Sequence, residues 1–240
     1  MKFPILTASQ TLVGKILKFP LSLIPPEAEV HILSGPLRGK KWIVGAASHA
    51  CWAGIYEAGR LRTFSDAISP GATVYDVGAN VGIFSLLAAV KAGPSGLVYA
   101  FEPVERNLAF LRRHMRLNQV RNCVILEAAV SDTAGIRRFS TAAWEPSMGR
   151  LAPDGEIEVS TVTLDNCIYG ESGFRHPDVL KIDVEGAECA VLEGAGRSIS
   201  EFHPVVFVEV HGIQQHAYCR TFLLARGYRI TEEYGLLTAT

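Results

Sequence analysis

Apolar runs of strand length alternate with periodic stretches of helix length from residue 72 onward. Short buried runs that end in turn residues are typical of strands, and repeats of three to four residues are typical of helices. We predict strands at 73–77, 97–101, 123–127, 179–183, 204–210 and about 228–232. We predict helices at about 81–92, 104–117, 187–195 and 214–226. This alternation predicts an α/β fold, a mostly parallel sheet with helices on both faces.

The stretch from 131 to 165 departs from this alternation. The segments "GIRRFS" and "EIEVSTVTL" read as strands, and a Pro-Asp-Gly turn signal lies between them. We therefore predict antiparallel strands inserted before the fourth strand, near the carboxyl edge of the sheet where α/β folds bind ligands. Trp144 in this insertion is either part of a substrate lid or an exposed loop aromatic.

The first 70 residues form an N-terminal extension in our interpretation, and residues 71–240 form the main domain. "VHILSGPLRGKKWIVG" predicts two strands joined by a glycine-containing turn, and a helix is expected at 56–68 before Ser-Pro-Gly. No run of about 18 apolar residues is present, so we expect no transmembrane helix. Residues 11–19 have the pattern of a short basic amphipathic helix, which either contacts a membrane surface or partner or packs on its own domain.

Composition narrows the class of protein. Of 240 residues, 48% are hydrophobic and 20% charged, an ordinary globular balance. The net charge of -1 gives no general attraction to nucleic acid, which we do not expect as a partner. Five cysteines without a CxxC spacing indicate neutral thiols in a reducing compartment, and we expect a cytoplasmic location.

The first candidate site follows the strand at 73–77, where "DVGANVG" runs from Asp76 to Gly82. Gly78 lets the backbone turn sharply beside a ligand, and Gly82 allows close packing where the next helix begins. The free N–H groups of that helix start favour a polar ligand. The turn residues Ala79 and Asn80 are counted with this site.

Two further strand ends point to a nucleoside. Glu102, twenty residues after Gly82, ends the second strand, where an acid accepts hydrogen bonds from both ribose hydroxyls. The backbone near Ala129, after the third strand, is placed to meet an adenine edge. A glycine turn alone is weak evidence, and the alternative is that the glycines only make turns and the acids are solvated.

The identity of the nucleoside follows from Asp76 and Asn80. A dinucleotide turn has a third glycine where Asn80 stands, and its glycines serve a pyrophosphate. The Asp76 carboxylate is a poor neighbour for a pyrophosphate and a good one for a cation. S-adenosylmethionine carries a sulfonium and an ammonium on the same adenosine, so we favour it over NAD.

Several segments resemble the FkbM-type methyltransferases: "DVGANVG", "FEP" with Asn107, and above all "LKIDVEGAECAVLEGA" followed by "PVVFVEVH". The resemblance covers about residues 28–232, and "KIDVEGAE" is its most specific part. It implies a Rossmann-like, seven-stranded class I methyltransferase fold with a short final hairpin. It also implies methyl transfer from S-adenosylmethionine, usually to a hydroxyl of a small metabolite, natural product or glycan. By this match the cofactor residues are Asp76, Gly78, Asn80, Gly82 and Glu102.

The second candidate site lies at the ends of strands four and five. Asp183 and Glu185 should emerge beside the cofactor, and His211 shares a strand face with Glu209. Transfer to a hydroxyl needs alignment and a base for its proton, and His211 fits that role best. Asp183 is expected to orient the hydroxyl, or to act as base if burial and Glu185 raise its pKa.

The same residues also have simpler interpretations. Lys181 is expected to balance the acids, and Glu188 to be a helix-start charge that favours the helix dipole. His211 could instead be a satisfied strand-end histidine, and Asp183 a structural residue. A divalent metal held by Asp183, Glu209 and His211 is an alternative that we do not favour.

Two other functional classes remain as alternatives. An NAD-dependent oxidoreductase is disfavoured by Asn80 and by the lack of a Tyr/Lys hydride-site motif. A non-catalytic nucleoside-binding scaffold is disfavoured by the acidic strand ends. The Asp/Asn-Pro-Pro-aromatic turn common in enzymes that methylate base amino groups is replaced by Asp-Val-Glu-Gly after strand four, which disfavours nucleic acid as the acceptor.

Overall fold

The computed structural model describes residues 24–142, 145–233 and 235–240. By its internal contacts the chain divides into two compact units, one ending at Tyr56 and the other beginning at Glu57. The helix expected within the N-terminal extension falls in the second unit by this division, and the predicted domain boundary at residue 70 stays a prediction. The possible amphipathic helix at 11–19 and the possible lid residue Trp144 lie outside the described residues.

The first unit contains a short hairpin. Strands β1 (Glu29–His31) and β2 (Lys41–Ile43) pair antiparallel, in agreement with the strand pattern of this segment. A 3-10 turn at Val44–Ala46 follows. Helix α2 (His49–Ala53) begins where the side chain of Ser48 accepts a hydrogen bond from the N–H of Ala50, an N-cap interaction.

The second unit is built on a seven-stranded sheet in the order β12-β13-β11-β10-β3-β4-β5. Strand β13 is antiparallel to both of its neighbours, β11 and β12, and the other neighbouring strands that the structure describes in this sheet pair parallel. The mostly parallel seven-stranded sheet is thus confirmed, and its short final hairpin does form. The strands are β3 (Thr73–Val77), β4 (Leu97–Phe101), β5 (Cys123–Leu126), β10 (Val179–Ile182), β11 (Val205–Glu209), β12 (Ile230–Glu233) and β13 (Leu236–Ala239).

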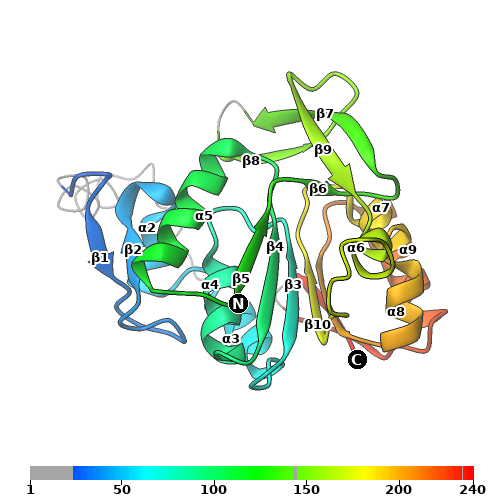
Figure 1. The fold of residues 1–240 in the computed structure, drawn as a ribbon, viewed down its shortest axis with the longest axis horizontal. Coiled ribbons are helices and arrows are strands. Elements are labelled where there is room, and N and C mark those ends of the chain that lie inside the picture. The colour runs from blue at the N-terminus through cyan, green and yellow to red at the C-terminus, as the bar shows by residue number, and fades with distance from the viewer. Residues whose placement is uncertain (1–23, 143–144, 234) are drawn as a thin grey trace. The chain divides into compact units, whose positions relative to one another are not determined.

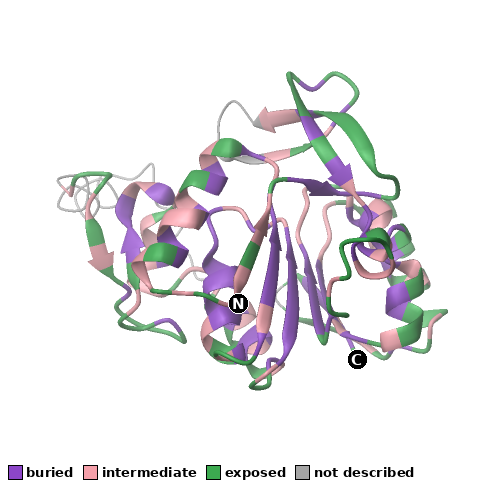
Figure 2. Ribbon diagram, in the orientation of Figure 1, coloured by how far each residue is buried: buried purple, intermediate pink, exposed green. Residues whose placement is uncertain are grey.

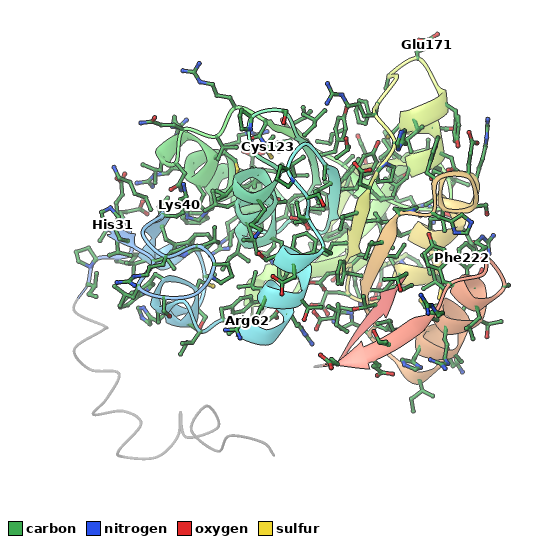
Figure 3. The ribbon with its side chains drawn as sticks, turned by 90° about the horizontal axis from the view of Figure 1, so that it is seen from below. His31, Lys40, Arg62, Cys123, Glu171 and Phe222 are labelled. Atoms are coloured by element: carbon green, nitrogen blue, oxygen red, sulfur yellow. The ribbon has the colours of Figure 1, made fainter. Side chains whose placement is uncertain are left out.

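Helices cover both faces of this sheet, with α3, α4 and α5 on one side and α6 to α9 on the other (Figure 1). Figure 3 labels Cys123, on the edge strand β5, and Phe222, on α9, well apart from each other. Helices α6 and α8 were not predicted, because six or seven residues are too few to display a helical period. The helices are α3 (Ala58–Asp66), α4 (Ile83–Ala92), α5 (Glu105–Leu117), α6 (Leu164–Tyr169), α7 (Glu188–Glu193), α8 (Gly196–Phe202) and α9 (Ile213–Leu224).

The central strands are buried on both faces (Figure 2). Tyr75, Leu180 and Val206, on three adjacent strands, belong to one core cluster with side chains of α6 to α9. Burial of a leucine such as Leu180 contributes about 1.5–3 kcal/mol. A continuous apolar run followed by a turn is what a parallel strand covered on both faces requires, so these strands are readable from sequence.

A second sheet of four strands forms the insertion, in the order β6-β9-β7-β8. The predicted antiparallel pairing is confirmed between β7 and β9. Strand β8 was not predicted because Pro146 and Gly149 argue against a strand, but β8 is an edge strand, where proline is tolerated. The strands are β6 (Ala129–Val130), β7 (Gly135–Ala142), β8 (Glu145–Leu151) and β9 (Ile157–Val162).

A small apolar cluster joins the insertion to the main sheet. Phe139 and Val159 of the insertion sheet pack with Ala129 and with Val104, which precedes α5, and Leu151 packs against this cluster. The insertion is therefore anchored beside the carboxyl ends of β4 and β5, where the sequence placed the nucleoside site.

Among the described residues, no helix has the length and apolar character needed to cross a lipid bilayer. All five cysteines are free thiols. Burial raises the pKa of the Cys123 thiol to about 12, so this thiol is neutral, as predicted.

Candidate active site

A cleft of about 630 Å³ opens at the carboxyl ends of β3, β4 and β10, bordered by the insertion sheet. Its place is the edge at which α/β sheets bind ligands. The residues that line it include Gly78, Asn80, Glu102, Asp183, Phe139 and Leu151.

The glycine turn after β3 runs against the loop that follows β10. Gly78 has a φ of +79°, and the N–H groups of Gly78 and Ala79 both donate to the carbonyl of Phe101. A Cβ atom on Gly78 would lie 1.8 Å from the carbonyl oxygen of Asp183. Only glycine therefore permits this turn and this contact together.

Glu102 is fixed on the wall of the cleft by three N–H donors. Its Oε2 accepts from the backbone of Asn80 at 2.8 Å, while its Oε1 accepts from the backbone of Val104 at 3.0 Å and from Asn107 Nδ2 at 3.1 Å. Burial raises the pKa of Glu102, and these donors oppose the rise. The carboxylate is thus oriented before any ligand binds.

Asn80 and Gly82 complete the turn. Asn80 has a φ of +51°, and its Oδ1 accepts from the backbone N–H of Val81 at 2.7 Å. This local bond favours the left-handed conformation at an asparagine. A Cβ on Gly82 would lie 2.4 Å from Leu111 Cδ1, so the glycine allows the start of α4 to approach α5.

Asp76 lies behind the turn and is fully buried. Its Oδ2 accepts from Ser85 Oγ at 2.5 Å, and its Oδ1 lies 3.1 Å from Lys181 Nζ. Burial lowers the pKa of Lys181, but the charges of Asp76 and Asp183 outweigh it and hold that pKa above its ordinary value. The charge of Asp76 is thus compensated inside the protein, and Asp183 is the acid nearer the cleft.

Asp183 and Glu185 both line the cleft and are partly exposed. Glu185 has a φ of +52°, a conformation that costs a non-glycine residue about 1 kcal/mol or more and that gathers at functional sites. Burial raises the pKa of Glu185, and Asp183 adds to the rise while His211 opposes it.

His211 lies beside Glu185, outside the lining of the cleft itself. Its Nδ1 lies 2.8 Å from Glu188 Oε1, and its Nε2 lies 3.5 Å from Glu185 Oε2 and 4.0 Å from Glu209 Oε1. The hydrogen bond with Glu188, aided by the charges of Glu185 and Asp183 and opposed by burial, raises the pKa of His211 to about 9.

Glu188 contacts the candidate site residue His211, although the sequence predicted only a helix-start charge for it. It does begin α7, as predicted, and its Oε1 accepts from the backbone N–H of Gly186 at 2.9 Å. It is also fully buried and bonded to His211, which its place in a helix start did not reveal. The packing of α7 on α9 is a tertiary contact, and no local sequence signal carries it.

The cluster of possible metal ligands differs from the predicted set by one residue, with Glu185 in the place of Glu209. Glu209 pairs with Arg60 of α3 at 2.5 Å, and Arg60 also lies 3.2 Å from Glu57. Among the residues that the structure describes, the three groups whose donor atoms lie within 4.8 Å of one another are instead Asp183, Glu185 and His211. Carboxylates and imidazole suit several divalent ions, and the same three groups equally suit proton transfer, so we assign no metal here.

The predicted residues thus divide into two groups by position, and their roles stay predictions. Of the predicted cofactor residues, Gly78, Asn80, Glu102 and Ala129 line the cleft, and Asp76, Ala79 and Gly82 shape the turn from outside the lining. Asn107 also lines the cleft, and its position five residues after Glu102, at the start of a helix, was a readable signal.

Comparison with known proteins gives consistent results. The Methyltransferase FkbM domain profile matches residues 76–230. The 31-O-demethyl-FK506 methyltransferase FkbM of Streptomyces tacrolimicus is 32% identical over 201 residues, covering 68% of this chain and 74% of that protein. The hexuronic acid methyltransferase AglP of Haloferax volcanii is 30% identical over 159 residues, covering 63% of this chain and 61% of that protein.

A solved structure supports the fold. The crystal structure of a methyltransferase FkbM from Methylobacillus flagellatus KT superimposes with a TM-score of 0.53 at 16% identity. The superposition covers 81% of this chain and 56% of that one. The chain therefore spans less than two thirds of the length of this structure and of the Haloferax protein.

Proposed function

Because the chain belongs to the FkbM-type methyltransferase family, we propose that it transfers a methyl group from S-adenosylmethionine to a hydroxyl of a small metabolite, natural product or glycan. One observation carries the choice of cofactor. The described lining of the cleft contains three carboxylates, Glu102, Asp183 and Glu185, and no lysine or arginine. Such a lining favours a cationic nucleoside and disfavours the pyrophosphate of NAD.

The described residues fit adenosine and a cation together. Glu102, whose two oxygens are already oriented, is suited to accept from the ribose hydroxyls. The apolar side chains of Val104 and Val130 give an aromatic base a dry surface. Asp183 and Glu185 supply negative charge for the sulfonium and ammonium groups. Lys181 lies 3.1 Å from Asp76 and 3.7 Å from Asp183, but Asp76 is fully buried outside the lining and Asp183 lines the cleft, so the acid for the cation is Asp183 in this proposal.

S-adenosylmethionine supplies, when bound, a methyl group on a positive sulfur, which the acceptor oxygen takes as the sulfur leaves as a neutral thioether. The acceptor hydroxyl must lose its proton to a group of this chain. Nε2 of His211 takes that proton, and Asp183 holds the hydroxyl in position. Glu185, 3.5 Å from Nε2 and exposed to the cleft, stabilises the imidazolium that results.

The relatives support oxygen as the acceptor atom, since one is named for an O-demethyl compound and another for a hexuronic acid. In this chain Phe139 and Leu151 bring apolar surface from the insertion to the cleft. We assign acceptor selection to this insertion, because its apolar side chains can contact the part of the acceptor beyond the reacting hydroxyl that Asp183 holds.

Calorimetry with S-adenosylmethionine and with NAD tests the cofactor, and methyl-labelled S-adenosylmethionine with a panel of hydroxylated acceptors tests the transfer. We expect binding of S-adenosylmethionine alone and label on an acceptor oxygen. Binding of NAD would favour the oxidoreductase alternative, and binding of neither would favour the scaffold.

Variants test the base. His211→Gln should lower turnover by about 10²-fold or more while affinity for S-adenosylmethionine stays within about twofold. His216→Gln is the matched control, because His216 is partly exposed and pairs with Glu232, which is exposed, at 3.2 Å. Full turnover in His211→Gln would remove His211 as the base.

A further inference from the structure

We propose that Glu188 is the positioning residue for His211: its buried carboxylate holds the imidazole so that Nδ1 carries a proton and Nε2 is turned toward the acceptor. This inference rests on the proposed function, in which His211 is the base. It assigns a role in the reaction to Glu188, which lies outside the lining of the cleft. A favourable interaction with the start of α7 would otherwise be enough to explain an acid at this position.

The hydrogen bonds fix the ring from behind. Glu188 is fully buried, and its Oε1 accepts from the backbone N–H of Gly186 at 2.9 Å as well as from His211 Nδ1 at 2.8 Å. A carboxylate can only accept, so Nδ1 is the protonated nitrogen in the neutral ring. The hydrogen bond from the Gly186 N–H fixes the Glu188 carboxylate at the start of α7. The carboxylate in turn fixes the orientation of the His211 ring.

The second ring nitrogen is left free to react. Nε2 lies 3.5 Å from Glu185 Oε2 and 4.0 Å from Glu209 Oε1, beyond good hydrogen-bond length in both cases. Glu209 is instead held by Arg60 at 2.5 Å. No hydrogen bond to Nε2 is found among the described residues, so this atom can take the proton of an acceptor hydroxyl.

The acidic groups around His211 come from three elements, and a fourth element supplies one cation. Asp183 and Glu185 belong to the loop after β10, Glu188 to α7 and Glu209 to the end of β11, and Arg60 of α3 offsets Glu209. The acids favour the imidazolium, which cannot serve as a base. Glu188 therefore has two opposing effects: it orients the ring, and it moves the neutral form of the ring to alkaline pH.

The variant Glu188→Gln separates these effects, because glutamine has nearly the same size and no charge. We expect the rising limb of kcat against pH to move down by about one pH unit or more, and the plateau to fall by about 10- to 10³-fold. The pKa of His211, followed by NMR titration, should fall in parallel. In Glu188→Asp the negative charge remains, but the shorter side chain moves the carboxylate away from Nδ1. The plateau of kcat should therefore fall, while the rising limb of kcat against pH stays near its alkaline position.

Glu232→Gln is the control, since it removes the carboxylate that lies beside His216 and should leave the kcat profile unaltered. An unmoved limb and an unmoved His211 pKa in Glu188→Gln would overturn the positioning role. If the His211 pKa falls but kcat does not follow it, His211 is not the base, and the role of Glu188 in the reaction fails with it. If Glu188→Gln does not fold, a Glu188→Asp enzyme with an unchanged plateau would overturn the inference by itself.

If no methyl transfer is found at all, the proposed function fails separately. The ¹⁵N shifts of His211 still report whether Nδ1 carries the proton. A ring protonated at Nε2 in its neutral form would contradict the geometry on which the inference stands.

Discussion

Lys181 donates a hydrogen bond to the main-chain carbonyl of Gly78 over 3.1 Å, and the same Nζ lies 3.1 Å from Asp76 Oδ1. The parallel register of β10 and β3 sets Lys181 opposite Asp76, which explains why a lysine occupies a buried strand. The ammonium also lies 4.8 Å from the centre of the Phe84 ring. One buried cation thus holds an acid, the glycine turn and an aromatic ring together.

Replacing Lys181 with methionine should destabilise the protein strongly. The substitution leaves the fully buried carboxylate of Asp76 without its cation, and breaking one partner of such a pair costs about 3–5 kcal/mol. The free energy of unfolding in urea measures this loss. Lys91→Met, at an exposed lysine in the last turn of α4, should change it by less than about 0.5 kcal/mol.

The double variant Asp76→Asn/Lys181→Met checks the cause of that loss. Removing both charges should recover part of the stability, because no uncompensated charge then stays buried. A double variant that is as unstable as the two single losses added together would show that the two side chains do not act as a pair.

Glu102→Gln should weaken binding of S-adenosylmethionine by about 10- to 100-fold, because an amide nitrogen cannot accept from a ribose hydroxyl. Calorimetry gives the affinity directly. Glu105→Gln is the matched control, since Glu105 is exposed at the start of α5 and outside the lining. Equal affinities in the two variants would remove Glu102 from the cofactor site.

Stability should depend on pH through His211. The pKa of His211 is raised from an ordinary value of about 6.5 in the unfolded chain to about 9 in the folded protein. A raised pKa means that the folded state binds the proton more tightly, so the stabilisation is complete below the unfolded value and is lost as the pH rises through about 9. The stability advantage of the wild type over His211→Gln should therefore shrink between about pH 6 and pH 10 in urea titrations. An advantage that grows with pH would contradict this sign.

Gly78→Ala should reduce stability and cofactor affinity together. Its Cβ would meet the Asp183 carbonyl at 1.8 Å, in addition to the cost of about 1–2 kcal/mol for a left-handed alanine. Gly227→Ala provides the control, since Gly227 has a φ of +84° with no atom within 4 Å of the added Cβ. Both variants carry the backbone cost, and only Gly78→Ala should lose affinity for S-adenosylmethionine in calorimetry.

The sequence predicts secondary structure best where a strand is buried on both faces, because such a strand needs a continuous apolar run. Strands β3 and β4 match their predicted bounds because every residue between two helical layers must be apolar or paired. The unpredicted β8 and α8 are an edge strand and a helix of seven residues, whose patterns are too short or too mixed to stand out. Strand β8 forms by pairing with β7, and α8 packs against α6, so both depend on tertiary contacts.

The candidate site divides in the same way. Glu102 and Asp183 could be predicted from the sequence. An acid at the carboxyl end of a parallel strand lies at the edge where such sheets bind ligands, whatever the rest of the structure. Asp76 also stands near the end of a strand in the sequence pattern. In the structure its carboxylate is paired with Lys181 of the adjacent strand inside the protein. The pairing of His211 with Glu188, and of Glu209 with Arg60, depends on how helices pack, which no local pattern records.

The contact of Gly78 with the Asp183 carbonyl has a consequence for how such an enzyme can diversify. The two loops touch backbone to backbone, so neither can be lengthened or reshaped without displacing the other. We therefore expect a change of length in one loop to require a matching change in the other. Under the proposed function we expect differences in acceptor to arise in the insertion, where Phe139 and Leu151 line the same cleft from a separate sheet.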